Sequence, residues 1–177
     1  MDRIMLIEDE VFQAQSLLLA LRKRFESAAL RVECHRNPQA ALARAYEAPF
    51  AVIISDFRMP GMDGIEFLKR FRSIQPDAVR LMLTATDDFQ TALTAINEAE
   101  VFRFVRKPWN EEGAQAVADA LARYARNVEE HHLADEQRVR RGELTPGELA
   151  LKRLEESEPG ITKVKWGPDG SVLLDDD

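Results

Sequence analysis

The sequence predicts an α/β protein in which five parallel strands form one sheet that helices cover on both faces. Short apolar runs alternate five times with longer amphipathic stretches, which is the pattern of repeated strand–helix units. The clearest run, residues 51–54, is rich in β-branched side chains and too short for a free-standing helix. A chain of 177 residues has room for one such domain and a smaller appendage.

The predicted elements follow the chain in strict alternation. We expect strands at residues 4–7, 31–34, 51–55, 79–83 and 101–105, and helices at residues 11–27, 38–47, 65–73 and 89–98. Asn37 can cap the second helix, and Pro38 fits its first turn because no N–H is needed there. A fifth helix begins near Asn110, and because residues 114–141 contain no Gly or Pro it can continue past the domain edge. We therefore place the domain at residues 1–126 and an extension at 127–177.

The sequence of the extension predicts that the fifth helix continues into it and that a short helix and a β-hairpin follow. Thr145 and Glu148 have capping-box spacing, and Pro159 ends the short helix that they start. The segments ITKVKW and SVLLD flank the sequence GPDG at residues 167–170, which is typical of a hairpin turn. A lone hairpin is marginal in water, so it should dock on its own domain, on a second copy or on a partner.

An apolar seam runs along the predicted fifth helix. Its members recur at alternating spacings of four and three: Val117, Leu121, Tyr124 and Val128. The next positions are His131 and Asp135, which does not favour a long coiled coil. The seam either packs on the sheet or contributes to a homodimer formed through the fifth helix and the extension.

Charge and composition exclude several classes of function. A net charge of −7 and a pI near 5.1 argue against non-specific binding to nucleic acid or to an anionic membrane. The extension also has no basic stripe and is too small for a three-helix DNA-reading domain. The single Cys34 excludes an intramolecular disulfide and favours the cytoplasm. The apolar run at residues 4–7 is too short for a signal peptide, and no run is long enough to cross a bilayer.

Polar residues follow four of the five predicted strands. They are Glu8 and Asp9 after the first strand, Asp56 after the third, Thr84 after the fourth, and Lys107 with Pro108 after the fifth. Parallel strands end at one edge of the sheet, so these residues should converge there. Three carboxylates so close together repel one another, and a hard divalent cation with oxygen ligands relieves this repulsion. Mg²⁺ is the expected occupant.

The same residues fit the parts needed for phosphoryl transfer. Asp56 would be the carboxylate nucleophile, and Glu8 and Asp9 would hold Mg²⁺ together with Asp56 and the backbone carbonyl of Arg58. Mg²⁺ and the Lys107 ammonium would neutralise charge on the phosphoryl oxygens. The Thr84 hydroxyl can donate to one of these oxygens, and Pro108 permits a cis Lys107–Pro108 bond that could aim the lysine inward.

Four segments together resemble the receiver domain of bacterial two-component response regulators: IEDE, SDFRMPGMDG, LMLTA and FVRKP. The resemblance covers residues 2–126 and implies a flavodoxin-like (βα)5 fold, phosphorylation of Asp56 by a sensor histidine kinase or phosphotransfer protein, and slow self-dephosphorylation. It also implies a switch in which Thr84 moves toward the phosphoryl group and Phe104 turns inward. Two positions depart from the family pattern: Glu8 replaces the commoner Asp, and Phe104 lacks the hydroxyl of a Tyr.

The segment INEAEVFRFVRKPWN is similar to receivers often joined to HD-GYP cyclic-dinucleotide phosphodiesterases, although residues 127–177 do not resemble such a catalytic domain. The leading hypothesis is a response regulator, not an enzyme, that signals through contacts with a downstream protein. One alternative is an adaptor that has the fold and works without phosphorylation. Another is a small phosphohydrolase, which would need a second acid/base carboxylate and a cap domain that the sequence does not supply.

Overall fold

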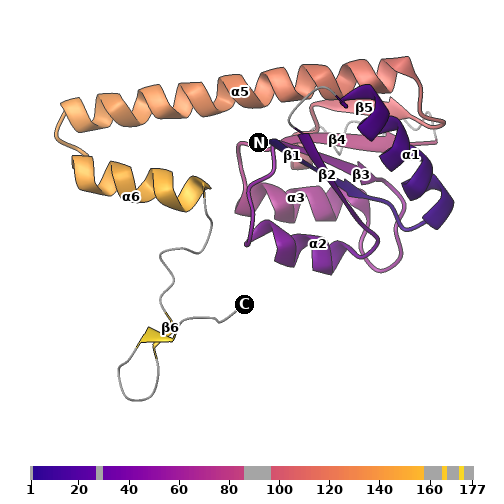
Figure 1. Cartoon of the computed structure of the whole chain (residues 1–177), viewed down its shortest axis with the longest axis horizontal. Helices are drawn as coiled ribbons and strands as arrows, with labels where there is room; N and C mark the ends of the chain where they lie inside the picture. Colours follow the sequence, from indigo (N-terminus) through magenta and orange to yellow (C-terminus); the bar gives the residue numbers. More distant parts are fainter. Residues whose placement is uncertain (1, 27–29, 86–96, 158–164, 167–171, 174–177) are drawn as a thin grey trace.

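Five parallel strands form one sheet in the order β2-β1-β3-β4-β5. The computed structural model describes residues 2–26, 30–85, 97–157, 165–166 and 172–173. The strands of the sheet are β1 (Asp2–Ile7), β2 (Leu30–His35), β3 (Val52–Asp56), β4 (Val79–Thr84) and β5 (Arg103–Arg106). The helices are α1 (Val11–Arg24), α2 (Pro38–Ala45), α3 (Gly64–Ile74), α5 (Glu111–Arg140) and α6 (Pro146–Ser157). This is the predicted doubly wound α/β fold with an extended helix α5 (Figure 1).

Two apolar layers enclose the sheet because alternate side chains of each strand face opposite sides. In β1, Ile4 and Leu6 belong to the core cluster that includes α1 and α5 residues. The intervening Met5 and Ile7 belong to the cluster that includes α2 and α3 residues. These four side chains of β1 are fully buried, as expected for a central strand of a parallel sheet. Helices thus cover both faces and leave the strand ends to form the site.

Several predicted helix starts are confirmed by side-chain caps. The Asn37 side chain accepts a hydrogen bond from Ala40 N, and Asp63 and Asn110 cap α3 and α5 in the same way. At α6 the capping box is complete, because Thr145 Oγ1 accepts from Glu148 N at 3.2 Å while the Glu148 carboxylate accepts from Thr145 N at 2.8 Å. These caps satisfy N–H groups that the first helical turn leaves free.

A few element boundaries differ from the sequence-based expectation. Asp56 is the last residue of β3, and β5 begins at Arg103 instead of residue 101. The buried Arg80 side chain donates to the Ala99 carbonyl at 2.9 Å, while the Arg80 carbonyl accepts from Phe102 N, so the chain before β5 is held outside the strand. α1 ends at Arg24. Most of the helix predicted at 89–98 lies outside the described residues, but residues 97–99 are described and are helical.

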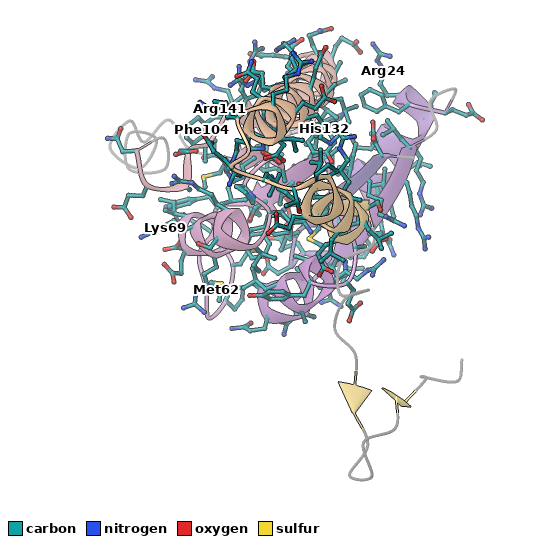
Figure 2. All side chains as sticks on the ribbon, turned by 90° about the vertical axis from the view of Figure 1, so that its left-hand side faces the viewer. Arg24, Met62, Lys69, Phe104, His132 and Arg141 are labelled. Carbon is teal, nitrogen blue, oxygen red and sulfur yellow. The ribbon has the colours of Figure 1, made fainter. Side chains whose placement is uncertain are left out.

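The extension forms an antiparallel pair of helices. α5 continues beyond the sheet, and α6 folds back beside it (Figure 1); Figure 2 views the two helices nearly end-on. Charge pairs join them: the buried Asp135 carboxylate binds Lys152, and Arg153 Nη2 lies 3.1 Å from Glu136 Oε1. At Asp135, α5 therefore contacts α6 through an ion pair, not through apolar packing.

The predicted hairpin is present in the part of the chain that the structure describes. Strands β6 (Lys165–Trp166) and β7 (Val172–Leu173) pair in antiparallel fashion, with Trp166 opposite Val172. Residues 167–170 of the expected turn lie outside the described residues. Within the described ranges, no helix combines the length and the apolar character that a bilayer crossing requires.

Candidate metal centre

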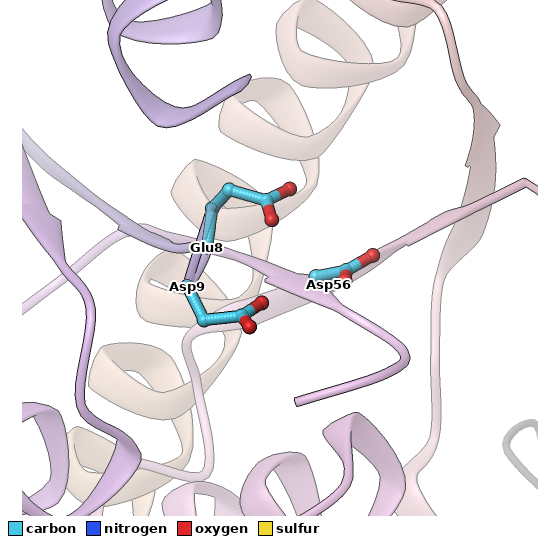
Figure 3. Close-up of side chains that lie close together, drawn as sticks. All are labelled: Glu8, Asp9 and Asp56. Atoms are coloured by element: carbon cyan, nitrogen blue, oxygen red, sulfur yellow. The ribbon is translucent and has the colours of Figure 1, made fainter. Parts of the chain in front are cut away.

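Three carboxylates meet at the carboxyl edge of the sheet. Glu8 and Asp9 follow β1, and Asp56 ends the neighbouring strand β3 (Figure 3). One oxygen from each carboxylate lies within 4.8 Å of the other two. Glu8 and Asp56 are buried, whereas Asp9 is half-buried. The parallel topology thus brings together residues that are up to 48 positions apart, 56 minus 8, in the sequence.

Lys107 supplies a cation to the same cluster. Its Nζ lies 2.6 Å from Glu8 Oε2 and 2.8 Å from Asp56 Oδ1. The backbone fixes its position, because Lys107 N donates to the Thr84 carbonyl at 2.9 Å just beyond the β4–β5 pairing. The Lys107–Pro108 peptide bond is cis. The predicted convergence of Glu8, Asp9, Asp56 and Lys107 is therefore what the structure shows.

Burial sets the electrostatics of this cluster. It raises the pKa of Glu8 above its ordinary value of 4.5, and the Asp56 charge acts in the same direction, while hydrogen bonding to Lys107 opposes both. Burial acts to lower the pKa of Lys107, but hydrogen bonds to Asp56 and Glu8 outweigh it, and that pKa is raised above 10.5. Lys107 therefore stays charged at neutral pH. One cation against three carboxylates leaves the site short of positive charge.

Thr84, Phe104 and Arg58 were also predicted to take part in the site. Thr84 is the half-buried last residue of β4, and Phe104 of β5 is partly buried against the core cluster on the α2 and α3 side. Arg58 follows Asp56 by two residues and has an exposed side chain. The expected roles of the Thr84 hydroxyl, the Phe104 ring and the Arg58 carbonyl remain predictions.

Gly64 shapes the loop behind Asp56. Gly64 N donates to the Phe57 carbonyl at 2.8 Å, and a Cβ on Gly64 would meet the Asp56 carbonyl oxygen at 2.3 Å. This close approach of two backbone segments requires a residue without a Cβ at position 64. Arg36 was missed altogether: its Nε donates to the Asp9 carbonyl at 3.2 Å. Arg36 directly follows β2 at the same edge of the sheet, and this position could have predicted its place beside the site.

The donor set fits a hard divalent cation. Carboxylate oxygens are the ligands that Mg²⁺ prefers, and a half-buried Asp9 leaves room for water in the coordination shell. The uncompensated negative charge described above favours binding of a cation in the same place. Fold and site together define a class of doubly wound α/β proteins that carry an acidic cation site beside a buried lysine at the carboxyl edge of the sheet.

Comparison with known proteins identifies the class more closely. The family model described as "Response regulator receiver domain" matches residues 4–119. The chain belongs to this family, the receiver domains of two-component response regulators.

Two solved structures and one curated relative illustrate the likeness. A crystal structure described as adenylate cyclase from Rhodopirellula baltica is 35% identical with a TM-score of 0.66, covering 76% of this chain and 97% of that one. The beryllofluoride-activated NtrC4 receiver domain dimer is 26% identical with a TM-score of 0.61, covering 70% and 99%. The hydrogenase transcriptional regulatory protein HoxA of Cupriavidus necator is 32% identical over 60% of this chain, which spans about a fifth (21%) of HoxA's length.

Proposed function

We propose that this chain accepts a phosphoryl group on Asp56 from a sensor histidine kinase or a phosphotransfer protein in the cytoplasm. The observation that carries the proposal is the placement of the Asp56 carboxylate. It lies 2.8 Å from the Lys107 ammonium and within 4.8 Å of the Glu8 and Asp9 oxygens. A nucleophile at the edge of the site can meet a phosphoryl donor, while the cation beside it stabilises the charge that develops.

The transfer itself needs few protein groups. An Asp56 carboxylate oxygen attacks phosphorus, the O–P bond forms, and the N–P bond to the donor imidazole breaks, so that the imidazole nitrogen leaves and takes a proton. Lys107 can stabilise the phosphoryl oxygens, since its contact with Asp56 places the ammonium beside the acceptor. Glu8, Asp9 and Asp56, with the Arg58 carbonyl, would hold Mg²⁺. The bound ion supplies further neutralisation of phosphoryl charge.

The output of phosphorylation would be a change in protein contacts. We propose that Thr84 reaches the phosphoryl group by hydrogen bonding and that Phe104 turns further inward, changing the surface around β5 and α5. With no catalytic role beyond its own dephosphorylation, the chain would act on a downstream protein. We propose a homodimer through α5 and the extension; the NtrC4 receiver, a dimer in its beryllofluoride-activated form, supports dimerisation of the receiver domain itself.

Incubation with acetyl phosphate and Mg²⁺ tests the acceptor assignment. The intact protein should gain the mass of one phosphoryl group, Asp56→Asn should not, and Asp119→Asn should behave as the wild type. Asp119 is a matched control because it is a partly exposed carboxylate on α5 that pairs with Arg103. Absence of any adduct would favour the adaptor hypothesis. Turnover of many phosphate esters per protein would favour the phosphohydrolase.

The dimer proposal has a separate test. Solution mass of the full chain should double when beryllium fluoride and Mg²⁺ are added, and should remain that of a monomer in the Asp56→Asn variant. A mass that is the same with and without beryllium fluoride would contradict phosphorylation-dependent dimerisation. It would leave the acceptor role of Asp56 unaffected.

A further inference from the structure

A groove of about 1050 Å³ lies between α6 and the sheet edge opposite the acidic site. One wall comes from the segments that precede β3 and β4, including Tyr46 and Ile74, so it lies at the amino ends of these strands. The other walls come from α5, with Tyr124 and Val128, and from α6, with Leu151. We call this the α6 groove. It exists because α6 folds back beside α5 (Figure 1).

The ionic groups around the α6 groove already have partners. His131 Nδ1 lies 2.9 Å from Asp77 Oδ1, and Lys152 binds Asp135. The apolar groups are less well covered, since Tyr46 is 56% exposed and Leu151 is 54% exposed. Large apolar side chains that face one groove from two walls indicate a site for another apolar surface. The best-suited occupant is therefore apolar, not charged.

Apolar residues alternate along the sequence of the β6–β7 hairpin. Residues directly opposite in an antiparallel ladder share one face of it, and the register pairs Trp166 with Val172. In the sequence, apolar Val164 and Leu174 continue the same two-residue alternation. Figure 1 shows β6 beyond the end of α6, and a two-stranded hairpin needs a covering layer to be stable in water. Docking of the hairpin in the α6 groove would thus cover apolar residues of both.

The covalent connection makes an intramolecular contact the favoured one. Ser157, the last residue of α6, itself lines the groove. Seven residues, 158–164, separate it from β6, and a chain extends by at most about 3.5 Å per residue, so β6 can reach points within roughly 25 Å. A tether of this length gives an effective concentration in the millimolar range, above the concentration of a second copy in ordinary solution.

We propose that the β6–β7 hairpin of the same chain docks in the α6 groove, with the face that carries Trp166 and Val172 against Tyr46 and Leu151. The docked hairpin covers the apolar wall of the receiver at the edge opposite the phosphoacceptor. This interaction does not depend on phosphorylation of Asp56.

Tryptophan fluorescence of the full chain tests the docking. The chain has two tryptophans, so subtracting the spectrum of each protein's Trp166→Phe counterpart isolates Trp166 from Trp109. In the wild type, Trp166 emission should be blue-shifted and its acrylamide quenching constant about threefold smaller than in Leu151→Glu, because docking removes the ring from solvent. Leu133→Glu is the matched control: Leu133 is 53% exposed, lies on α5 and is not a lining residue of the groove. Tyr46→Asp tests the opposite wall and should act as Leu151→Glu does.

Each remaining outcome overturns the proposal. A solvent-exposed Trp166 in the wild type would mean that the hairpin waits for another protein. Shielding that grows with protein concentration, together with a doubled mass, would mean that a second copy supplies the hairpin. Equal quenching in Leu151→Glu and Leu133→Glu, with helix content unchanged by circular dichroism, would place Trp166 somewhere other than the α6 groove.

Discussion

Replacing Lys107 by Met should tighten Mg²⁺ binding even though it impairs phosphoryl transfer. Lys107 contacts Glu8 and Asp56 at 2.6 and 2.8 Å, so it neutralises part of the charge that would hold the ion. Methionine is similar in length and carries no charge. Its substitution removes a cation that competes with the metal for the same carboxylates.

The change in Mg²⁺ affinity can be estimated from the distance between the ion and the Lys107 ammonium. An oxygen that binds Mg²⁺ at about 2.1 Å and the Lys107 ammonium at 2.8 Å keeps the two cations at most about 5 Å apart. Charges of +2 and +1 at that separation repel by roughly 1.7 kcal/mol at the dielectric constant of water and by several kcal/mol at an effective value of 20. Because the site opens at the sheet edge, we take a repulsion energy near the lower of these two values. About 2 kcal/mol corresponds to roughly 30-fold tighter binding.

Isothermal titration calorimetry with MgCl₂ at neutral pH measures this difference. Lys69→Met is the control, because Lys69 is an exposed lysine that pairs with Glu98 at 2.8 Å on another part of the surface. That variant should bind Mg²⁺ as the wild type does. Equal or weaker binding by Lys107→Met would show that the lysine does not oppose the ion, and the electrostatic reasoning would be refuted.

Three further substitutions test the structure in urea denaturation. Gly64→Ala should destabilise the fold by about 2 kcal/mol or more, because its Cβ would approach a backbone oxygen to 2.3 Å; Gly147→Ala, with nothing within 4 Å, should be neutral or mildly stabilising. Arg80→Met should cost about 3 kcal/mol, since the buried guanidinium donates to three backbone carbonyls that would lose their partner. Glu33→Gln should lower stability at pH 7 and flatten the acid limb, because hydrogen bonding to Arg44 at 2.9 Å lowers the pKa of Glu33 below 4.5. That contribution is present above pH 4.5 and is lost as the pH falls through the folded-state value.

Three results would contradict these expectations. An unfolding midpoint of Gly64→Ala equal to that of Gly147→Ala would mean that the loop relaxes without cost. A loss below about 1 kcal/mol for Arg80→Met would mean that water replaces the guanidinium. An acid limb of Glu33→Gln as steep as that of the wild type would assign the pH dependence to other carboxylates.

The cluster at the acidic edge could be predicted because its geometry follows from topology alone. Once each strand is assigned as parallel, Glu8, Asp56 and Lys107 must lie at one edge, whatever the details of packing. The alternation of apolar and polar residues sufficed for that assignment. The roles of Thr84 and Phe104 depend on side-chain rotation, which a strand pattern does not determine.

Contacts that depend on where separate elements meet could not be predicted. Asp135 interrupts the apolar spacing of α5, and its ion pair with Lys152 depends on α6 folding back beside α5. Arg80 lies in a run that predicts a buried strand, and no local pattern shows that its guanidinium reaches the carbonyl of Ala99, 19 residues on. Both are polar groups whose partners come from tertiary structure, not from the spacing of neighbours.

The unbroken length of α5 has a mechanical consequence. Its 30 residues, at 1.5 Å each, make a rod of about 45 Å, and side-chain contacts attach it to the sheet domain as far along as His131, which lies 2.9 Å from Asp77. The nine residues beyond His131 add about 14 Å, so a tilt of about 10° about that point would move the end of α5 by roughly 2 Å. Movements of α5 on the sheet are thus passed to the start of α6 by a continuous helix, without any joint along the way.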